Sequence, residues 1–149
     1  MQTIDLRFWR VWVDEQGVSH QTRHAFDDYK QSVFAEGATS LWNAIHYTGP
    51  ATIITLILMP GDLKDWHENP KPQWIITLNG IWCVETMDGY IVEMGPGEIS
   101  FGGDQGTLNN KGHRSWAVGD TLVELMLIQV SEPPPWNPCN SMSGTVKSS

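Results

Sequence analysis

The residues best suited to chemistry in this sequence lie in one short polar segment that precedes an apolar run. His67, Asn69 and Gln73 are separated by even numbers of residues, so in an extended chain their side chains project to the same side. An imidazole accepts or donates a proton near neutral pH, and amides can orient substrate oxygens or stabilise a developing negative charge. Inside an apolar barrel, such groups cost free energy unless they bond to one another, to a ligand or to a metal ion. The cluster therefore indicates a binding or catalytic site.

The segments around this site read as short strands separated by turns. Aromatic and β-branched residues form runs bounded by Gly, Pro, Asn and Asp, as in an antiparallel sandwich or barrel. Asn79-Gly80 and Asp88-Gly89 predict two-residue hairpin turns, because both central positions of a type I′ turn need positive φ. The strands that we expect are Arg7–Val13, Val18–Phe26, Leu41–Tyr47, Ala51–Met59, Trp74–Asn79, Ile81–Thr86, Tyr90–Glu93, Ile99–Phe101, Ser115–Val118 and Thr121–Val130, with a helical turn over Asp27–Ala35.

The length of 149 residues predicts one domain. We expect residues 1–130 to form the barrel with its N-terminal strands, and residues 131–149 to form a Pro-rich, partly mobile arm that Trp136 can anchor. Ala51–Met59 and Thr121–Val130 are apolar at both parities, which is typical of strands covered on both faces. A second subunit can supply the second cover, so we expect a homodimer; two stacked sheets are the alternative within one chain.

Composition excludes several classes of partner. The net charge of −8 at pH 7 argues against nucleic-acid binding, which needs clustered Lys and Arg, and against anionic membrane surfaces. No run reaches the ~18 apolar residues of a membrane-spanning helix, and the first residues lack the basic-then-apolar order of a secretory signal. We expect Cys83 and Cys139 to be unpaired thiols of a cytoplasmic protein, and the partner to be a small molecule.

The polar segment also resembles a known family. Residues 61–80 are similar to the first motif of the cupin superfamily, G-x5-H-x-H-x3-E-x6-G, with Gly61, His67 and Gly80 agreeing in type. Asn69 stands at the second His of that motif and Gln73 at the Glu. The similarity is closest to small single-domain cupins that read D-W-H-x-x-P-x-x-Q, then D-x-x-G and G-H, and it covers roughly residues 15–130. The matching residues are Asp65-Trp66-His67, Pro70, Gln73, Asp104, Gly106 and Gly112-His113.

This resemblance implies an all-β fold, the single-domain cupin barrel, which is a double-stranded β-helix or jelly roll of antiparallel strands. It also implies that His113 reaches His67 and Gln73 from a neighbouring strand, at the bottom of an aromatic-lined cavity. For the ligand we expect contacts from Asn69 and from Asp104, which sits in a Gly-rich loop that we interpret as a mobile lip tied down by Asp104. Three further ring residues are expected at the mouth of the cavity: Trp42, His46 and Trp116.

Two reactions are compatible with these residues. If a metal is bound, the resemblance implies His67, Gln73 and His113 as ligands of a divalent transition metal such as Fe, Ni, Mn or Zn, and a metal-dependent oxygenase. However, Gln73 offers a neutral amide oxygen where the cupin motif has a carboxylate. Without a metal, His67, His113 and Gln73 are the catalytic residues of an acid–base enzyme.

We favour this metal-free interpretation, a lyase or isomerase that dehydrates, isomerises or cyclises an apolar or aromatic metabolite. An aromatic pocket with few basic residues suits such a substrate better than a phosphorylated one, because little positive charge is available to neutralise phosphate. The loss of the cupin carboxylate also leaves a third class open, a non-catalytic protein that binds a small ligand. The sequence does not decide whether a cofactor is bound, since amides and imidazoles occur in the sites of all three classes of protein.

Overall fold

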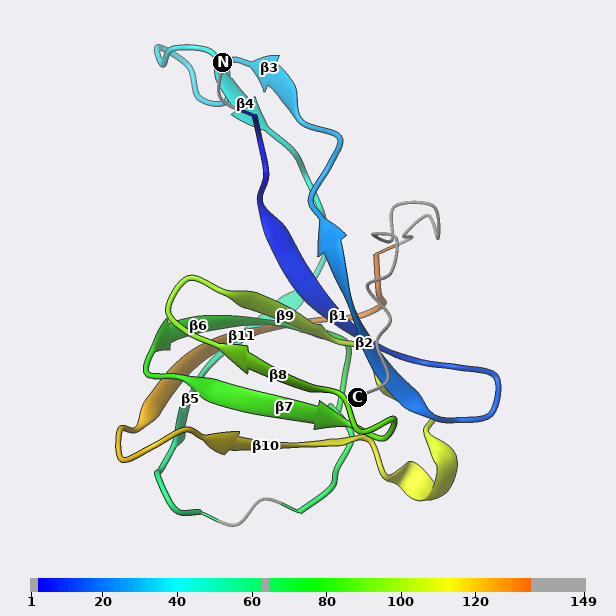
Figure 1. The fold of residues 1–149 in the computed structure, drawn as a ribbon. Helices are drawn as coiled ribbons and strands as arrows, with labels where there is room; N and C mark the ends of the chain where they lie inside the picture. Colours follow the sequence, from blue (N-terminus) through cyan, green and yellow to red (C-terminus); the bar gives the residue numbers. More distant parts are fainter. Residues whose placement is uncertain (1–2, 63–64, 135–149) are drawn as a thin grey trace.

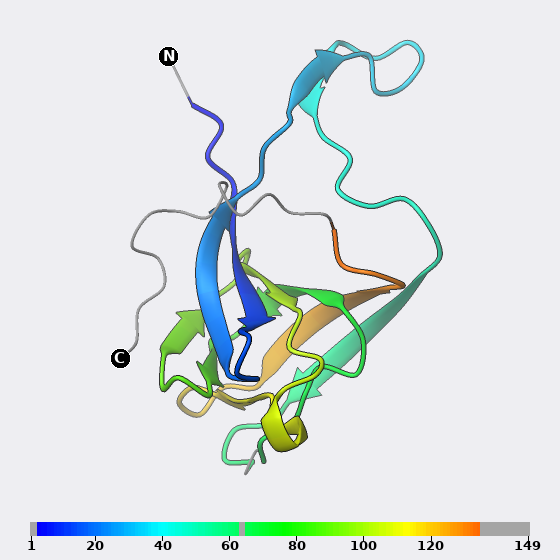
Figure 2. The ribbon, with the colours of Figure 1, turned by 90° about the vertical axis from the view of Figure 1, so that its right-hand side faces the viewer.

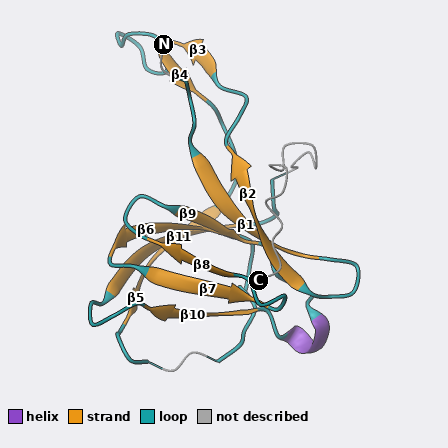
Figure 3. Ribbon diagram, in the orientation of Figure 1, coloured by secondary structure: helices purple, strands orange, loops and turns teal. Residues whose placement is uncertain are grey.

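The computed structural model describes residues 3–62 and 65–134, and these residues form an all-β barrel of jelly-roll type (Figures 1 and 3). Eleven strands and one 3-10 helix account for its regular structure. They are β1 Arg7–Val13, β2 Ser19–Ala25, β3 Lys30–Ser32, β4 Leu41–Asn43, β5 Ala51–Leu58, β6 Gln73–Asn79, β7 Trp82–Thr86, β8 Ile91–Met94, β9 Ile99–Gly102, η1 Leu108–Asn110, β10 His113–Ala117 and β11 Val123–Val130.

Two sheets face each other across the core. The larger sheet has the order β2-β1-β9-β6-β11-β5, and the smaller has the order β10-β7-β8 (Figure 1). All pairs within the two sheets are antiparallel except β1 and β9, which run parallel. The predicted barrel of antiparallel strands is thus confirmed in its architecture, with one parallel pair that the sequence did not indicate.

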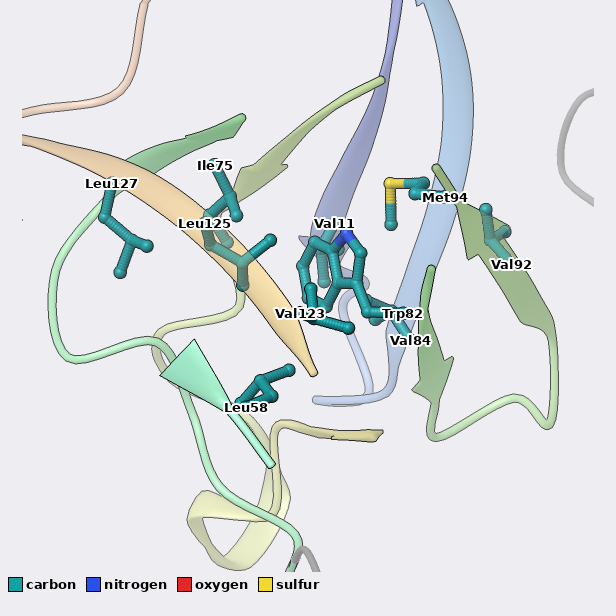
Figure 4. Close-up of a cluster of buried hydrophobic side chains, with 10 residues drawn as sticks. All are labelled: Val11, Leu58, Ile75, Trp82, Val84, Val92, Met94, Val123, Leu125 and Leu127. Atoms are coloured by element: carbon teal, nitrogen blue, oxygen red, sulfur yellow. The ribbon is translucent and has the colours of Figure 1, made fainter. Parts of the chain in front are cut away.

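The larger core lies between the inner faces of the two sheets (Figure 4). A second buried cluster, Phe8, Trp74, Phe101 and Val130, lies on the other face of the six-stranded sheet. Along β6, Ile75 and Thr77 point inward, and the Trp82 indole of the opposite sheet donates to the Thr77 hydroxyl at 2.7 Å. This bond satisfies a polar tip that the large ring would otherwise bury alone. The buried apolar side chains around it are Val11, Leu58, Ile75, Trp82, Val84, Val92, Met94, Val123, Leu125 and Leu127.

The predicted helical turn over Asp27–Ala35 is wrong. Lys30–Ser32 is strand β3, which pairs with β4 in a separate two-stranded sheet. Asp28 adopts a φ of +61°, a left-handed conformation that a continuing helix cannot contain. Residues 27–49, which we call the arm, project away from both sheets (Figures 1 and 2).

Of the two predicted hairpin turns, one is confirmed. Asp88-Gly89 joins β7 to β8, which are paired antiparallel, and Gly89 has a φ of +85°. Asn79-Gly80 instead connects β6 to β7, which belong to different sheets. Gly80 has the expected positive φ of +77°, but a Cβ there would meet the Leu122 carbonyl oxygen at 2.4 Å. The turn is therefore a corner between sheets, where the chain passes too close to its neighbour for a side chain.

Within this chain strand β5 has no second cover, so the alternative of two stacked sheets is wrong for it, and cover by a second subunit stays a prediction. Strand β5 is the edge of the six-stranded sheet and pairs only with β11. Leu58 points into the core, while Ile53 and Ile57 are 66% and 59% exposed. Strand β11, in contrast, lies between β5 and β6 and is largely enclosed.

Three remaining expectations concern the cysteines, the C-terminal segment and membrane-spanning helices. Cys83 on β7 is a buried free thiol, and burial beside Glu93 raises its pKa to about 11. Cys139 and Trp136, with the rest of the predicted Pro-rich C-terminal segment beyond Pro134, lie outside the described residues. Among the described residues, no helix has the length and apolar character needed to cross a membrane.

Candidate functional site

Four of the predicted polar residues meet at one end of the barrel and are buried there. Gln73 is the first residue of β6, and His113 is the first residue of β10. Asn69 lies four residues before β6, and Asp104 follows β9. Because β9 runs antiparallel to β6, its end lies against the beginning of β6, with Gly102 opposite Gln73. The exposed fractions of these side chains are 5% or less, and that of Asp104 is zero.

The four side chains form one hydrogen-bonded chain. Asp104 Oδ1 accepts bonds from the Asn69 backbone N–H at 3.0 Å and from Asn69 Nδ2 at 2.7 Å. Asn69 Oδ1 accepts a bond from Gln73 Nε2 at 2.6 Å, and Gln73 Oε1 accepts one from Gln129 Nε2 at 3.0 Å. At the other end, His113 Nδ1 lies 2.6 Å from Asp104 Oδ2. Since a carboxylate only accepts, the orientation of both amides and the donor role of His113 Nδ1 follow from the charge of Asp104.

The Asp104 carboxyl is held as an anion by these donors. Burial alone would raise its pKa, but the hydrogen bond and charge of His113 and the bonds from Asn69 outweigh burial. The net effect lowers the pKa of Asp104 below its ordinary value. An ionised carboxylate with no exposed surface is thus present beside an imidazole, an arrangement that stabilises the protonated ring.

His67 lies against His113 but at the surface. The two residues exchange backbone hydrogen bonds of 2.8 and 2.9 Å, and their ring centroids are 4.8 Å apart. His67 Nδ1 lies 2.9 Å from the Asp65 carbonyl oxygen, to which it donates. The expectation that His67 points inward with Asn69 and Gln73 is wrong: its side chain is exposed, because His67 makes only an isolated bridge and is not part of a strand.

The close approach of the two histidine segments depends on Gly112. A Cβ at this position would meet the His67 carbonyl oxygen at 2.1 Å, and Gly112 has a φ of +69°. No residue with a side chain fits this backbone without a shift. The Gly112-His113 pair that carried the family resemblance is therefore needed for the geometry that joins the two imidazoles.

The loop of residues 103–112 is fixed by residues that were not predicted from the sequence. Glu68 Oε2 accepts bonds from the Thr107 N–H at 2.7 Å and from the Thr107 hydroxyl at 2.5 Å, and Gln105 Nε2 donates to the Asn69 carbonyl at 3.1 Å. Burial raises the pKa of Glu68, but the bonds from Thr107 and Asn110 lower it more. The loop is thus tied to residues 67–69 by several bonds, as expected for Asp104, and its interpretation as a mobile lip has no support in these contacts.

Of the three remaining predicted ligand-binding residues, Trp42 and His46 lie elsewhere, which corrects their assignment to the site, whereas Trp116 is near it but points away from His113. Trp42 is on the arm and is 58% exposed. His46 packs against Phe26, with ring centroids 4.6 Å apart, at the base of the arm. Trp116 lies on the opposite face of β10 from His113, by the period-two alternation of the strand.

A different aromatic group lies beside the histidines. The Arg114 guanidinium is 5.2 Å from the Trp66 ring centre and 5.8 Å from that of Trp116. Lys111 Nζ is 4.5 Å from the Trp66 ring centre. Trp66 immediately precedes His67, so it is the indole nearest in the chain to the imidazole pair, a position that sequence reasoning assigned to Trp42 and Trp116.

The residues present do not fit the metal ion that the family resemblance implied. Both polar atoms of the Gln73 amide are engaged, by Asn69 and Gln129, and both carboxylate oxygens of Asp104 accept bonds. Across residues 3–62 and 65–134, no group of three or more His, Cys, Asp or Glu side chains is arranged to hold a metal. His67 and His113 alone would offer two imidazole nitrogens without a charged donor, fewer ligands than a transition-metal site uses.

No family model matches this chain, and no curated protein matches it. Among solved structures, the crystal structure of protein NMB1881 from Neisseria meningitidis is similar, with a TM-score of 0.43 and 16% sequence identity. The similarity covers 57% of this chain and 79% of that chain. A similarity at this level carries no argument about this chain.

Proposed function

We propose that this protein is a small-molecule enzyme of the lyase or isomerase type, in which His113 and His67 act as an acid–base pair without a metal ion. The observation that carries the proposal is the bond of 2.6 Å between the His113 ring and the fully buried Asp104, next to an exposed second imidazole. Buried charges are costly unless they are paired. A buried carboxylate–imidazole pair is weak evidence for stability, and at the end of a small barrel it indicates a functional site.

His113 is suited to the role of general base. Its Nδ1–H donates to Asp104, so in the neutral ring Nε2 carries the lone pair that accepts a proton. Asp104 fixes the tautomer and the ring plane, and its charge stabilises the imidazolium that forms when Nε2 takes the proton. Asn69 holds Asp104 in turn through two bonds to Oδ1. Asn69 and Gln73 are therefore positioning residues in this proposal, whereas sequence reasoning gave Gln73 a direct catalytic role.

His67 is suited to the role of general acid. Its Nδ1 donates to the Asp65 carbonyl, so a protonated ring presents Nε2–H as its second donor. The side chain is exposed and exchanges protons with water, which restores the acid after each turnover. A base and an acid whose ring centres are 4.8 Å apart can act on neighbouring atoms of one substrate.

The pair accounts for dehydration or isomerisation of a carbonyl compound. His113 Nε2 removes the proton from the carbon next to the carbonyl, and the electron pair of that C–H bond forms an enolate. In dehydration, His67 gives its proton to a hydroxyl group on the next carbon, which leaves as water while a C=C bond forms. In isomerisation, the proton returns to a different atom. We propose an apolar or aromatic substrate, for which the half-buried Trp66 beside His67 provides an aromatic contact.

The same proposal assigns the chain to the cupin superfamily and to the cytosol. Support comes from the jelly-roll barrel, from the positions of His67 and His113 at adjoining chain segments, and from the free thiol of Cys83. The metal-dependent oxygenase and the non-catalytic binding protein are the competing functions. The experiment below separates both from the acid–base enzyme.

The test is hydrogen exchange on a panel of aromatic ketones and β-hydroxy ketones in D2O, followed by proton NMR. Removal of a carbon-bound proton exchanges it for deuterium even when the net reaction is unknown. We expect the wild-type protein to exchange at least one panel member, and His113→Gln to lower that rate by roughly 10²–10⁴-fold. His46→Gln is the matched control, since His46 lies at the base of the arm, and it should keep the rate. Exchange that is equal in wild type and His113→Gln would refute the proposal.

A further inference from the structure

The arm exposes an unusual amount of apolar surface. Five of its large apolar side chains are at least half exposed, with Phe34 at 72% and Ile45 at 80%. Exposed apolar patches of this kind mark interaction surfaces in soluble proteins. The residues concerned are Val33, Phe34, Leu41, Trp42 and Ile45.

The arm has no core of its own. Strands β3 and β4 are three residues long, and every residue of β3 is exposed. An isolated two-stranded hairpin is marginally stable in water and gains stability by packing against another surface. The base of the arm packs on the six-stranded sheet through Tyr47, but β3 and β4 project beyond both sheets and need another surface to pack on (Figures 1 and 2).

The outer face of the six-stranded sheet is a second apolar surface of the same chain. Strand β5 contains no charged residue over its eight positions, so its free edge lacks the charges and prolines that usually protect an edge. Ile53 pairs with Ile128 on β11, and Ile128 pairs with Trp74 on β6. Along this row Ile53 is exposed, Ile128 is half-buried and Trp74 is buried beneath the Phe26 ring. Trp74 and Ile128 line a cavity of about 300 Å³ together with Phe26, His46, Ile76 and Ile99 among others.

We propose that the chain forms a two-fold symmetric homodimer in which the arm of each copy lies on the outer sheet face of the other. The arm rises on the side of the six-stranded sheet that faces away from the three-stranded sheet (Figures 1 and 2). In each copy, the arm and the outer sheet face enclose an angle. A second copy, related by a two-fold axis, places its own arm and outer sheet face in that angle. Such an interface uses each surface twice, which explains why one chain exposes both.

The exposed area fits a stable dimer. Eight side chains of the two surfaces are 50–80% exposed, namely the five of the arm together with Ile53, Ile57 and Met59. If each offers about 150 Å², the lower end of the range for an aromatic side chain, they expose on the order of 750 Å² per copy. A standard stable interface buries about 800 Å² per partner.

The test is the oligomeric state of the full chain by sedimentation equilibrium. We expect a dimer for the wild type, and at least a hundredfold higher dissociation constant for Phe34→Asp and for Ile53→Asp. Both side chains are exposed in the single chain, so both variants should keep the wild-type circular dichroism spectrum. Ile91→Asp is the matched control: Ile91 is 49% exposed on β8 of the other sheet, and this variant should remain dimeric.

Each remaining result would overturn the proposal. A wild-type chain that stays monomeric at about 100 µM has no interface of this strength. Dimers that survive both aspartates use another surface. Dissociation by Ile53→Asp alone would mean that edges of β5 pair without the arm. None of these results bears on the acid–base proposal, because the residues changed lie outside the histidine site.

Discussion

Asp104 is the residue on which the site's geometry depends most, because its two oxygens connect the histidine to the amides. Replacing Asp104 by Asn removes the acceptor that fixes His113 Nδ1 as a donor, so the ring can adopt the wrong tautomer. We expect Asp104→Asn to lower the exchange rate on the active panel compound by roughly 10²–10⁴-fold. The rate is measured by the NMR assay described above.

Asp88→Asn is the matched control for this change. Asp88 Oδ2 lies 2.9 Å from His20 Nδ1, so it forms a second carboxylate–imidazole pair that shares no residue with the Asp104–His113 pair. Its loss should cost stability without affecting exchange. An Asp104→Asn rate within twofold of the wild-type rate would show that Asp104 has only a structural role.

The sequence predicted which residues meet at the site better than it predicted where their side chains point. Asn69, Gln73, Asp104 and His113 are brought together as a buried polar cluster, because each belongs to a barrel end where strands begin or finish. The direction of His67 was wrong, since period-two alternation applies only to residues within a strand. Glu68 could not be predicted, because its partner Thr107 is 39 residues away and no local pattern joins them.

At the scale of elements, strand β2 places a histidine where it is difficult to protonate. His24 is buried, and burial together with the positive charge of Arg10 lowers its pKa from 6.5 to about 4. The unfolded chain takes up this proton near pH 6.5, whereas the folded chain does so only near pH 4. Stability associated with neutral His24 is therefore present above pH 6.5 and is lost as the pH falls from 6.5 to about 4.

His24→Gln should remove this part of the acid sensitivity. We expect the free energy of unfolding, from urea titrations, to fall less between pH 7 and pH 4.5 in His24→Gln than in the wild type. The comparison uses the slope with pH, because substitution of a buried side chain also changes stability at every pH. An identical slope in both proteins would contradict the assigned pKa.

The junction between the segment of residues 67–69 and β10 makes a second prediction. Gly112→Ala places a methyl group on the His67 carbonyl, so the two histidine segments must separate. We expect a loss of roughly 2 kcal/mol or more in the free energy of unfolding and a loss of exchange activity. Gly106→Ala is the control, because Gly106 also has a positive φ, +85°, but a Cβ there meets nothing within 4 Å.

The control variant should lose only about 1 kcal/mol, the cost of a left-handed alanine, and should keep its activity. Equal effects of the two substitutions would mean that the close approach at Gly112 is unimportant. Urea unfolding and the exchange assay measure both quantities on the same samples.

Elements were predictable where the pattern was local. The Asp88-Gly89 hairpin is confirmed because turn and paired strands are neighbours in the chain. The Asn79-Gly80 hairpin was wrong because the same dipeptide also suits a corner between sheets, and only the long-range pairing of β6 with β9 and β11 decides between the two. Strand β3 was missed because Lys30–Ser32 is polar and fully exposed, so it carries no apolar alternation, whereas β4 lies within the predicted strand Leu41–Tyr47.

At the scale of the whole molecule, the apolar character of Ala51–Met59 predicts a homodimer, because a second subunit can cover the second face. The folded single chain leaves β5 as an exposed edge. The prediction of a homodimer from this segment therefore stays a prediction, which the arm and the outer sheet face give a specific geometry. The loop that carries η1 beside the site and the arm lie at opposite ends of the molecule (Figure 3), so this dimer leaves the histidine pair open to small molecules.

The measurement that tests the central claim most directly is the exchange rate of chelator-treated protein, compared between wild type and His113→Gln. If His113 and His67 act without a metal, the treated wild-type protein keeps its full rate, and His113→Gln falls to the background of buffer alone. A rate that disappears on chelation and returns with one particular divalent metal would contradict the account, as would a His113→Gln variant that exchanges as fast as the wild type.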